Sequence, residues 1–193
     1  MNFLINIILD LLFPRRCPVC GQIVMPKGSL ICPGCVKKLS WVRGPVCNCC
    51  GKEIISGTME YCPDCAAHPR SFSHGMALFN YNEISAPSLA MVKYHDRREY
   101  LDFYAEAAYR RYAKTIARLS PDLIIPVPVH KSRLKKRGFN QTEEFGKRLS
   151  VYLGIPMSSE YLIRSKKTAP QKDLGPALRL KNLEQAFFCK KLP

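Results

Sequence analysis

The sequence predicts two parts of different fold classes: a small cysteine-rich ribbon module, followed by an α/β domain in which helices flank a mainly parallel sheet. Nine of the ten cysteines fall between Cys17 and Cys65, in turns rich in glycine and proline. Beyond residue 70, amphipathic helical segments alternate with short apolar runs, a pattern typical of α/β domains. At 193 residues, the chain has room for one ordinary domain beside a metal-stapled module.

The cysteine-rich module is an internal duplication. Eight of its nine cysteines form four Cys-x-x-Cys pairs, and a shift of 30 residues places the first two pairs on the last two. The same shift moves Gly21 onto Gly51 and Pro33 onto Pro63. The pairs are Cys17/Cys20, Cys32/Cys35, Cys47/Cys50 and Cys62/Cys65.

The repeat predicts two structural zinc ions, because Zn²⁺ prefers four soft ligands arranged tetrahedrally and each unit supplies four cysteines. One ion is expected on Cys17, Cys20, Cys32 and Cys35, and the other on Cys47, Cys50, Cys62 and Cys65. A cross-braced arrangement, in which the first pair joins the third, stays open. We interpret Cys49 as a spare thiol and His68 as a bystander.

Other uses of these cysteines fit the sequence less well. Four disulfides would need an oxidising compartment, and we find no secretion signal, so we expect a cytoplasmic protein with reduced thiols. A thioredoxin-like motif uses one Cys-x-x-Cys beside a βαβ pattern. An iron–sulfur cluster stays open, although the duplicated ribbon spacing favours zinc.

The chain begins with an apolar segment, Met1–Phe13, that is too short for a membrane-spanning helix and is interrupted by Asn6 and Asp10. We expect residues 1–14 to form an amphipathic helix, with a peripheral membrane contact as the alternative. The double ribbon should occupy residues 15–68, and a linker should follow it.

The expected α/β domain comprises residues 71–193. Apolar spacing predicts helices over 84–94, 100–119, 140–153 and 177–185, and apolar content predicts strands over 75–81, 121–129, 159–164 and 186–189. The strand at 121–129 is β-branched without polar alternation, which predicts burial on both faces. Cys189 is expected to be a small core residue.

The positive charge lies mainly in the second part. The chain carries a net charge of +15, and residues 71–193 hold 22 basic and 11 acidic side chains. Such a field favours polyanions, a solvated lysine-rich surface being the plain alternative. The apolar strand, basic loop and helix start at 121–141 predict a phosphate, pyrophosphate or nucleic-acid site. Its candidate residues are Lys131, Arg133, Lys136, Arg137, Asn140 and Gln141.

Several motifs together resemble the ComF family of competence-associated proteins. These motifs are Leu11–Gly21, Lys93-Tyr94-His95, Val127–His130, Arg137–Gln141, Thr168–Gln171 and the later Arg179, Asn182, Ala186 and Phe187. The resemblance implies a double zinc ribbon joined to a type I phosphoribosyltransferase-like domain that acts in DNA uptake or transformation. It also implies that loop 130–137 contacts pyrophosphate and that a mobile loop near 164–175 closes over phosphoribosyl pyrophosphate. A full-length relative is expected to bind that ligand together with Mg²⁺.

The chain departs from that family at the nucleotide motif. No acidic pair followed by a Thr-Thr-Gly turn comes after an apolar strand. The family pattern places that motif soon after residue 189, so we interpret the second domain as C-terminally incomplete and its catalytic status as open. The alternative hypothesis is a non-catalytic zinc-ribbon adaptor for single-stranded DNA or a competence helicase, with Phe139 and Tyr161 as candidate stacking residues.

Overall fold

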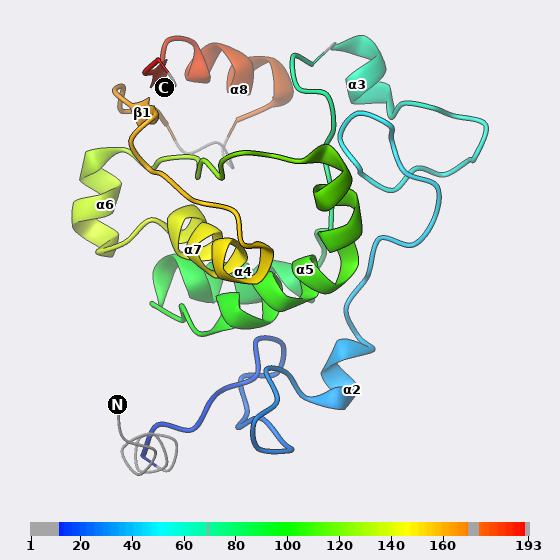
Figure 1. Cartoon of the computed structure of the whole chain (residues 1–193), viewed down its shortest axis with the longest axis vertical. Coiled ribbons are helices and arrows are strands. Elements are labelled where there is room, and N and C mark those ends of the chain that lie inside the picture. Colours follow the sequence, from blue (N-terminus) through cyan, green and yellow to red (C-terminus); the bar gives the residue numbers. More distant parts are fainter. Residues whose placement is uncertain (1–11, 69, 170–173, 192–193) are drawn as a thin grey trace. The chain divides into compact units, whose positions relative to one another are not determined.

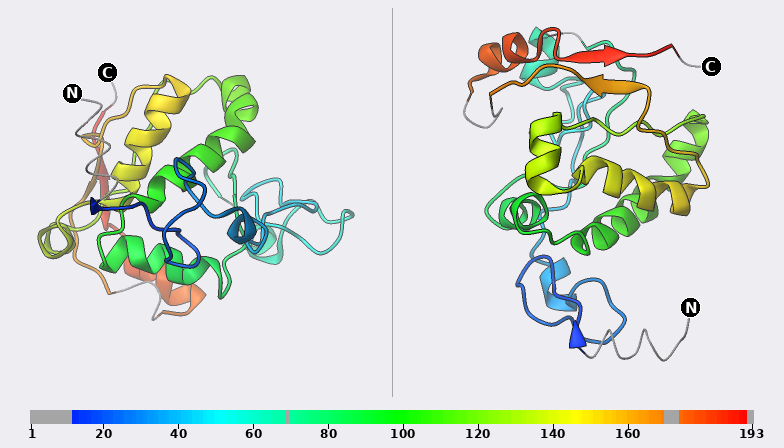
Figure 2. Two further views of the ribbon diagram at one scale, coloured as in Figure 1. Left: turned by 90° about the horizontal axis from the view of Figure 1, so that it is seen from below. Right: turned by 90° about the vertical axis from the view of Figure 1, so that its left-hand side faces the viewer.

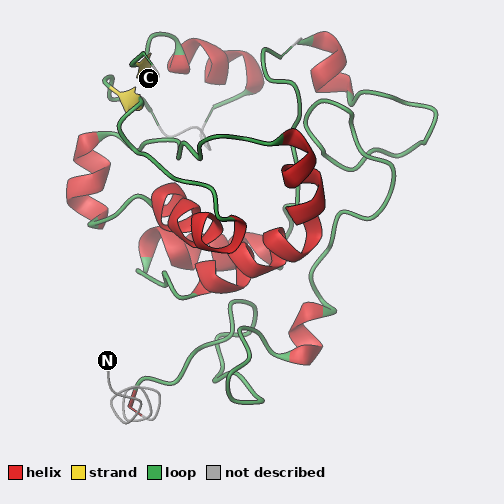
Figure 3. Ribbon diagram, viewed as in Figure 1, coloured by secondary structure: helices red, strands yellow, loops and turns green. Residues whose placement is uncertain are grey.

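The computed structural model describes residues 12–68, 70–169 and 174–191. The expected N-terminal helix over 1–14 therefore lies outside the described residues, apart from its last three positions. The chain divides into two compact units, Met1–Phe103 with Arg110–Tyr112 and Tyr104–Tyr109 with Ala113–Pro193. Helices dominate over strands (Figures 1 and 3). The elements are α2 (Pro33–Val36), α3 (Pro63–Ala67), α4 (Ser85–Tyr94), α5 (Tyr100–Leu119), α6 (Lys131–Arg137), α7 (Gln141–Leu153), β1 (Leu162–Arg164), α8 (Pro176–Leu183) and β2 (Phe187–Cys189).

The two ribbons of the first unit share a backbone conformation as well as a sequence pattern. In each ribbon the first cysteine donates its N–H to a carbonyl five residues later, from Cys17 to Gln22 and from Cys47 to Lys52, at 2.8 Å in both. Gly21 and Gly51 follow the second cysteine of each turn, and both have φ of 70°. Because this left-handed conformation is nearly free of cost only for glycine, the Cys-x-x-Cys-Gly sequence determines the turn.

Each ribbon then closes with one antiparallel bridge and one short helix. The bridges join Arg16 to Ile23 and Val46 to Glu53. The helices are α2 and α3, and both begin with a proline directly after a cysteine. Proline suits the first helical turn because its missing N–H would have no partner there.

An aromatic cluster forms the core of the first unit beside the ribbons. The rings of Trp41 and Phe79 lie 4.5 Å apart, and that of Phe103 lies 6.2 Å from Phe79. Val42 and Val92 are almost fully buried. The predicted strand at 75–81 appears here as a single bridge between Phe79 and Trp41, flanked by hydrogen bonds from Val42 to Leu78 and from Asn80 to Ser40.

The second unit contains helix α7, which the sequence predicted over 140–153. Helix α7 begins at Gln141, and the Asn140 side chain caps it by accepting from the Thr142 N–H at 3.3 Å. Gly154 ends it in the left-handed conformation. Strands β1 and β2 pair antiparallel, with Ile163 opposite Phe188, and run side by side in Figure 2. The predictions of strands near 159–164 and 186–189 and of a helix near 177–185 are thus confirmed.

Three details of the sequence prediction are wrong: the buried strand at 121–129, the core position of Cys189 and the loop at 131–137. The segment 121–129 makes one parallel bridge, from Ile124 to Met157, and Val127 is 53% exposed, so it is not a strand buried on both faces. Pro126 and Pro128 lack the N–H groups that a longer ladder requires. Cys189 is exposed and does not belong to the core.

The basic stretch 131–137 is helix α6 and not a loop. It contains neither glycine nor proline, and lysine, arginine and leucine favour helix. The His130 ring accepts from the Ser132 N–H at 3.2 Å, and Gly138 ends the helix with φ of 82°. Across the part of the chain that the structure describes, no helix is both long and apolar enough to cross a membrane.

The second ribbon depends on a close approach between two glycines. A Cβ atom on Gly75 would lie 2.8 Å from the Cα of Cys50, and one on Gly51 would lie 2.4 Å from the carbonyl oxygen of Gly75. The Gly75 N–H also donates to the Cys49 carbonyl at 2.6 Å. The backbone at Gly75 thus packs directly on the second metal-binding turn.

We predict that Gly75→Ala destabilises the second ribbon by about 1–3 kcal/mol, because backbone atoms of the Cys50 turn must move. Gly34→Ala is the matched control, since a Cβ atom there meets nothing within 4 Å. Thermal unfolding and zinc retention against a weak chelator measure the effect. Equal behaviour of the two variants would contradict the close packing.

Candidate metal centres and basic surface

The structure gathers the eight paired cysteines into two groups of four. One group contains Cys17, Cys20, Cys32 and Cys35, and the other Cys47, Cys50, Cys62 and Cys65. Within each group the sulfur atoms all lie within 4.8 Å of one another. Consecutive pairs therefore meet, as the 30-residue repeat favoured, and the cross-braced arrangement is not what the backbone builds.

Each group combines a tight turn with a helix start. The first two sulfurs come from a Cys-x-x-Cys-Gly turn, and the next two come from the residue before α2 or α3 and from within that helix. Cys17 and Cys47 are fully buried, whereas Cys20 is exposed. The two ribbons thus offer the same donors, although the first is more open to solvent.

Backbone N–H groups favour a thiolate in each group. Burial alone would raise the pKa of Cys17, but N–H groups of Cys20, Cys32 and Val19 outweigh it and lower the pKa to about 7. In the second group, burial again opposes the shift, while N–H groups near the sulfur lower the pKa of Cys47 to about 6. Burial first, and then neighbouring sulfurs, raise the pKa of Cys35 to about 12. Four sulfurs so close together can all ionise only beside a cation.

The donor set fits zinc. The Sγ atoms of Cys50 and Cys62 lie 3.8 Å apart, which is roughly the edge of a tetrahedron with Zn–S bonds of ~2.3 Å. All ten cysteines are free, so no disulfide competes for the sulfurs. Such an ion would draw the thiolates together and fix the fold of each ribbon, which is a structural role.

The spare thiol Cys49 and the nearby His68 lie outside these groups. Cys49 is half-buried and packs against the second group without being one of the four sulfurs that meet. His68 is exposed, and its Nδ1 lies 3.4 Å from an Asp64 carboxylate oxygen. Both placements agree with the interpretation of Cys49 and His68 as bystanders.

The predicted anion-binding residues divide between helix α6 and the start of α7. Five of the seven residues of α6 are basic, and none of the seven is buried. Asn140 is only 7% exposed and donates to the Val127 carbonyl at 3.3 Å, besides capping α7. Gln141 accepts from Arg137. The exposed cations of α6 are therefore better placed to meet an anion than the two amides are.

The start of α7 is less favourable for an anion than the sequence suggested. Glu143 and Glu144 occupy its first turn, where acidic side chains already complement the helix dipole. Both carboxylates pair with Lys147 at 3.1 Å. Phe139 is 5% exposed and is thus unavailable for base stacking, whereas Tyr161 is partly exposed.

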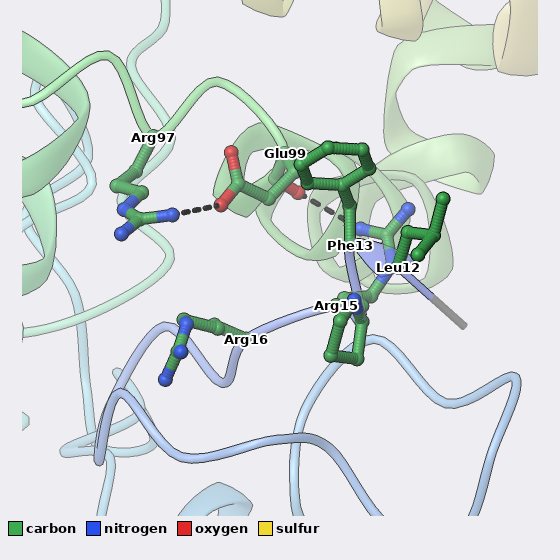
Figure 4. A pocket seen from close by; sticks show the side chains of 7 residues that line it. Leu12, Phe13, Arg15, Arg16, Arg97 and Glu99 are labelled. Carbon is green, nitrogen blue, oxygen red and sulfur yellow. Dashed lines mark hydrogen bonds and ion pairs between the residues drawn. The ribbon is translucent and has the colours of Figure 1, made fainter. Parts of the chain in front are cut away.

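A separate pocket of about 540 Å³ lies at the entrance to the first ribbon (Figure 4). Arg15 is paired there with Asp102 at 2.8 Å and donates to the Glu99 carbonyl at 3.0 Å. Arg97 lies 3.6 Å from the Glu99 carboxylate. Since acids balance two of its three arginines, we interpret the pocket as the place where the first ribbon is tied to the start of α5.

We predict about two zinc ions per chain by elemental analysis of protein purified without added metal. Cys17→Ser/Cys32→Ser should retain about one ion, because both residues belong to one group. Cys17→Ser/Cys47→Ser should retain none, because it removes one ligand from each group. The reverse result would establish the cross-braced arrangement, and one ion or none in the unmodified chain would contradict the duplicated ribbon.

The remaining thiols should be dispensable. Cys49→Ser/Cys189→Ser is expected to leave both the zinc content and the far-UV circular dichroism spectrum unchanged, because neither sulfur belongs to a group of four. Loss of one ion on changing Cys49 alone would show that the second group is wrongly assigned.

Comparisons with known proteins agree with the ribbon geometry. A family described as a double zinc ribbon domain matches residues 8–66. Together with the two groups of cysteines, this match supports structural zinc in the chain. No solved structure matches the chain.

Curated relatives match far beyond the ribbons. Competence protein F of Haemophilus influenzae is 30% identical over 179 residues, which is 91% of this chain and 76% of the relative. The DNA utilization protein YhgH of Escherichia coli K12 is 26% identical, over 90% of this chain and 77% of its own length. Competence protein ComFC of Bacillus subtilis is 23% identical, over 86% and 71%. With its double zinc ribbon and this similarity along nearly its whole length, the chain belongs to the competence protein F (ComF) family.

Proposed function

We propose that this protein acts on DNA during uptake or utilization, with its zinc ribbons as structural supports and helix α6 as a contact for the phosphate backbone. The names of its relatives, competence protein and DNA utilization protein, support the process. The observation that carries the contact is α6, where five basic residues meet no acidic neighbour within the helix. A cluster of cations on an exposed helix releases counterions when it binds a polyanion.

Single-stranded DNA is the form that we propose, with a competence helicase as the alternative partner. The basic side chains of α6 supply backbone contacts without reading sequence, as single-strand binders do. The buried Phe139 offers no stacking surface, so the contact is expected to be mainly electrostatic and insensitive to sequence. The cytoplasm is the proposed compartment, because the zinc-binding thiolates must stay reduced.

We further propose that residues 71–193 form a phosphoribosyltransferase-like domain with a mainly parallel sheet, after residues 15–68 as the double ribbon. The parallel bridge between Ile124 and Met157 supports this, since the chain between these residues carries α6 and α7, as a strand–helix–strand crossover would. Phosphoribosyl pyrophosphate with Mg²⁺ is accordingly the second candidate ligand for the cations near α6.

We predict that Lys131→Glu/Lys136→Glu weakens binding of a single-stranded oligothymidylate at least about tenfold, because two contacts become repulsive. The slope of log affinity against log salt should fall by roughly 0.7 for each phosphate contact that is lost. Fluorescence anisotropy over a range of salt measures both quantities.

The matched control is Lys37→Glu/Lys38→Glu, which makes the same change of charge at two exposed lysines of the first unit. It should retain the affinity and slope of the unmodified chain. Equal loss in both double variants would show that net charge alone drives binding and would contradict a contact at α6. Tight, Mg²⁺-dependent binding of phosphoribosyl pyrophosphate, with no DNA binding, would favour the second candidate ligand.

A further inference from the structure

A second cationic site is indicated by one atom, the Nε of Arg164. Among the residues that the structure describes, it is the buried side-chain nitrogen that has no hydrogen-bond partner. Buried polar groups in folded proteins are almost always paired, because a buried donor without a partner loses the hydrogen bonds that it makes to water in the unfolded chain. Arg164 ends strand β1, so its backbone is held by pairing with Phe187 in β2.

Two guanidinium groups converge near this atom. Arg164 donates through Nη2 to the Thr168 hydroxyl, and Arg133 of helix α6 donates through Nη2 to the Thr168 carbonyl at 3.4 Å. The Arg164 guanidinium also lies over the ring of Phe187, 5.3 Å from its centroid. Residues 133, 164 and 168 all belong to the second unit, so the arrangement is internal to one compact body.

Among the described residues, no acid balances this pair of charges. Neither arginine forms an ion pair with any carboxylate that the structure describes. Burial lowers the pKa of Arg164, and the nearby charge of Arg133 lowers it further. Three lysines, Lys166, Lys167 and Lys181, line the adjoining pocket of about 370 Å³, which also includes Thr168. Like charges brought together without a counter-charge are what an anion-binding site requires before its ligand arrives.

We propose that Arg133 and Arg164 together bind one phosphate group beside Thr168. On a guanidinium, Nε and Nη2 form one edge that can meet two phosphate oxygens side by side. The Thr168 hydroxyl occupies only the Nη2 half of that edge. A phosphate that displaces this hydroxyl pairs with both donors of Arg164, satisfies the buried Nε and screens Arg164 from Arg133. The three lysines then attract the charges that flank the phosphate.

This inference rests on the proposed function, because it specifies how the α6 surface recognises phosphate and adds a residue 27 positions beyond α6. The shared ligand chemistry is a phosphate group, which comes either from the backbone of single-stranded DNA or from a small diphosphate. Packing of Arg164 on Phe187 for stability alone is the competing account. That account leaves the Nε without a partner and predicts no effect on ligand binding.

The test compares Arg164→Ala, Arg133→Ala, their double variant and Arg164→Lys in the full chain. Arg118→Ala is the control, since Arg118 is an exposed arginine at the end of α5. Affinity for oligothymidylate is measured across salt, and affinity for inorganic diphosphate by calorimetry. Circular dichroism and zinc content report folding.

We expect each alanine variant to lose about tenfold in affinity, the change that ~1.4 kcal/mol produces. The salt slope for DNA should fall by roughly 0.7, one phosphate, in each single variant and by no more in the double variant. Arg164→Lys should also bind more weakly, because it keeps the charge but loses the two-donor edge. Arg118→Ala should bind as the unmodified chain does. An effect restricted to diphosphate identifies a small ligand, and one restricted to oligothymidylate identifies the DNA backbone.

Normal binding by Arg164→Ala, together with weak binding by Lys131→Glu/Lys136→Glu, would overturn this site and leave the proposed function standing. Normal binding by all of these variants would overturn both. If Arg164→Ala loses its folded spectrum, Arg164→Lys and Arg133→Ala decide, and normal affinity in both would overturn the proposal. Additive losses in the double variant, with a slope change of two phosphates, would show that the two arginines bind separately.

Discussion

The first unit depends on one constraint: four sulfur atoms must lie around a single cation. Each ribbon buries very few apolar side chains, chiefly Val24 and Ile31 in the first and Ile54 in the second, so hydrophobic burial alone is a weak source of stability. A four-thiolate site supplies what the core lacks, because metal binding and folding are then the same event. The 30-residue repeat is preserved in hydrogen bonds, bridges and glycine conformation for this reason.

Residues close to the metal ligands also form hydrogen bonds and ion pairs with other segments of the first unit. Arg15, two residues before the first ligand, is paired with Asp102 in α5. Glu53, three residues after Cys50, accepts from the N–H groups of Arg43 and Gly44 and from the Asn80 side chain. The Asn80 amide first, and then these N–H groups, lower the pKa of Glu53. Loss of either ion would therefore loosen contacts well outside the cysteine turns.

The ribbons and most helices follow from local sequence patterns and could be predicted. Contacts between residues far apart in the sequence could not. Cysteine spacing identified both groups of four, and apolar spacing placed α5 and α7 to within a residue. The charge of residues 131–137 predicts a solvated loop, whereas their helix propensity and the caps at His130 and Gly138 make them a helix. Prolines shortened the expected strand at 121–129 to one bridge. Arg164 gave no sequence signal as a partner of Arg133, since only folding brings both side chains to Thr168.

X-ray absorption at the zinc edge tests most directly the claim that four-thiolate zinc sites organise the first unit. The measured signal averages over both ions. The structure predicts that this average shows a single shell of four sulfur atoms per zinc at ~2.3 Å, with no nitrogen or oxygen neighbour. Partial occupancy of the sites leaves the number of sulfur neighbours per bound zinc unchanged. A shell containing nitrogen would bring a histidine such as His68 into a site and contradict the two groups of cysteines. An iron signal in place of zinc, or sulfur held in disulfides, would contradict the account altogether.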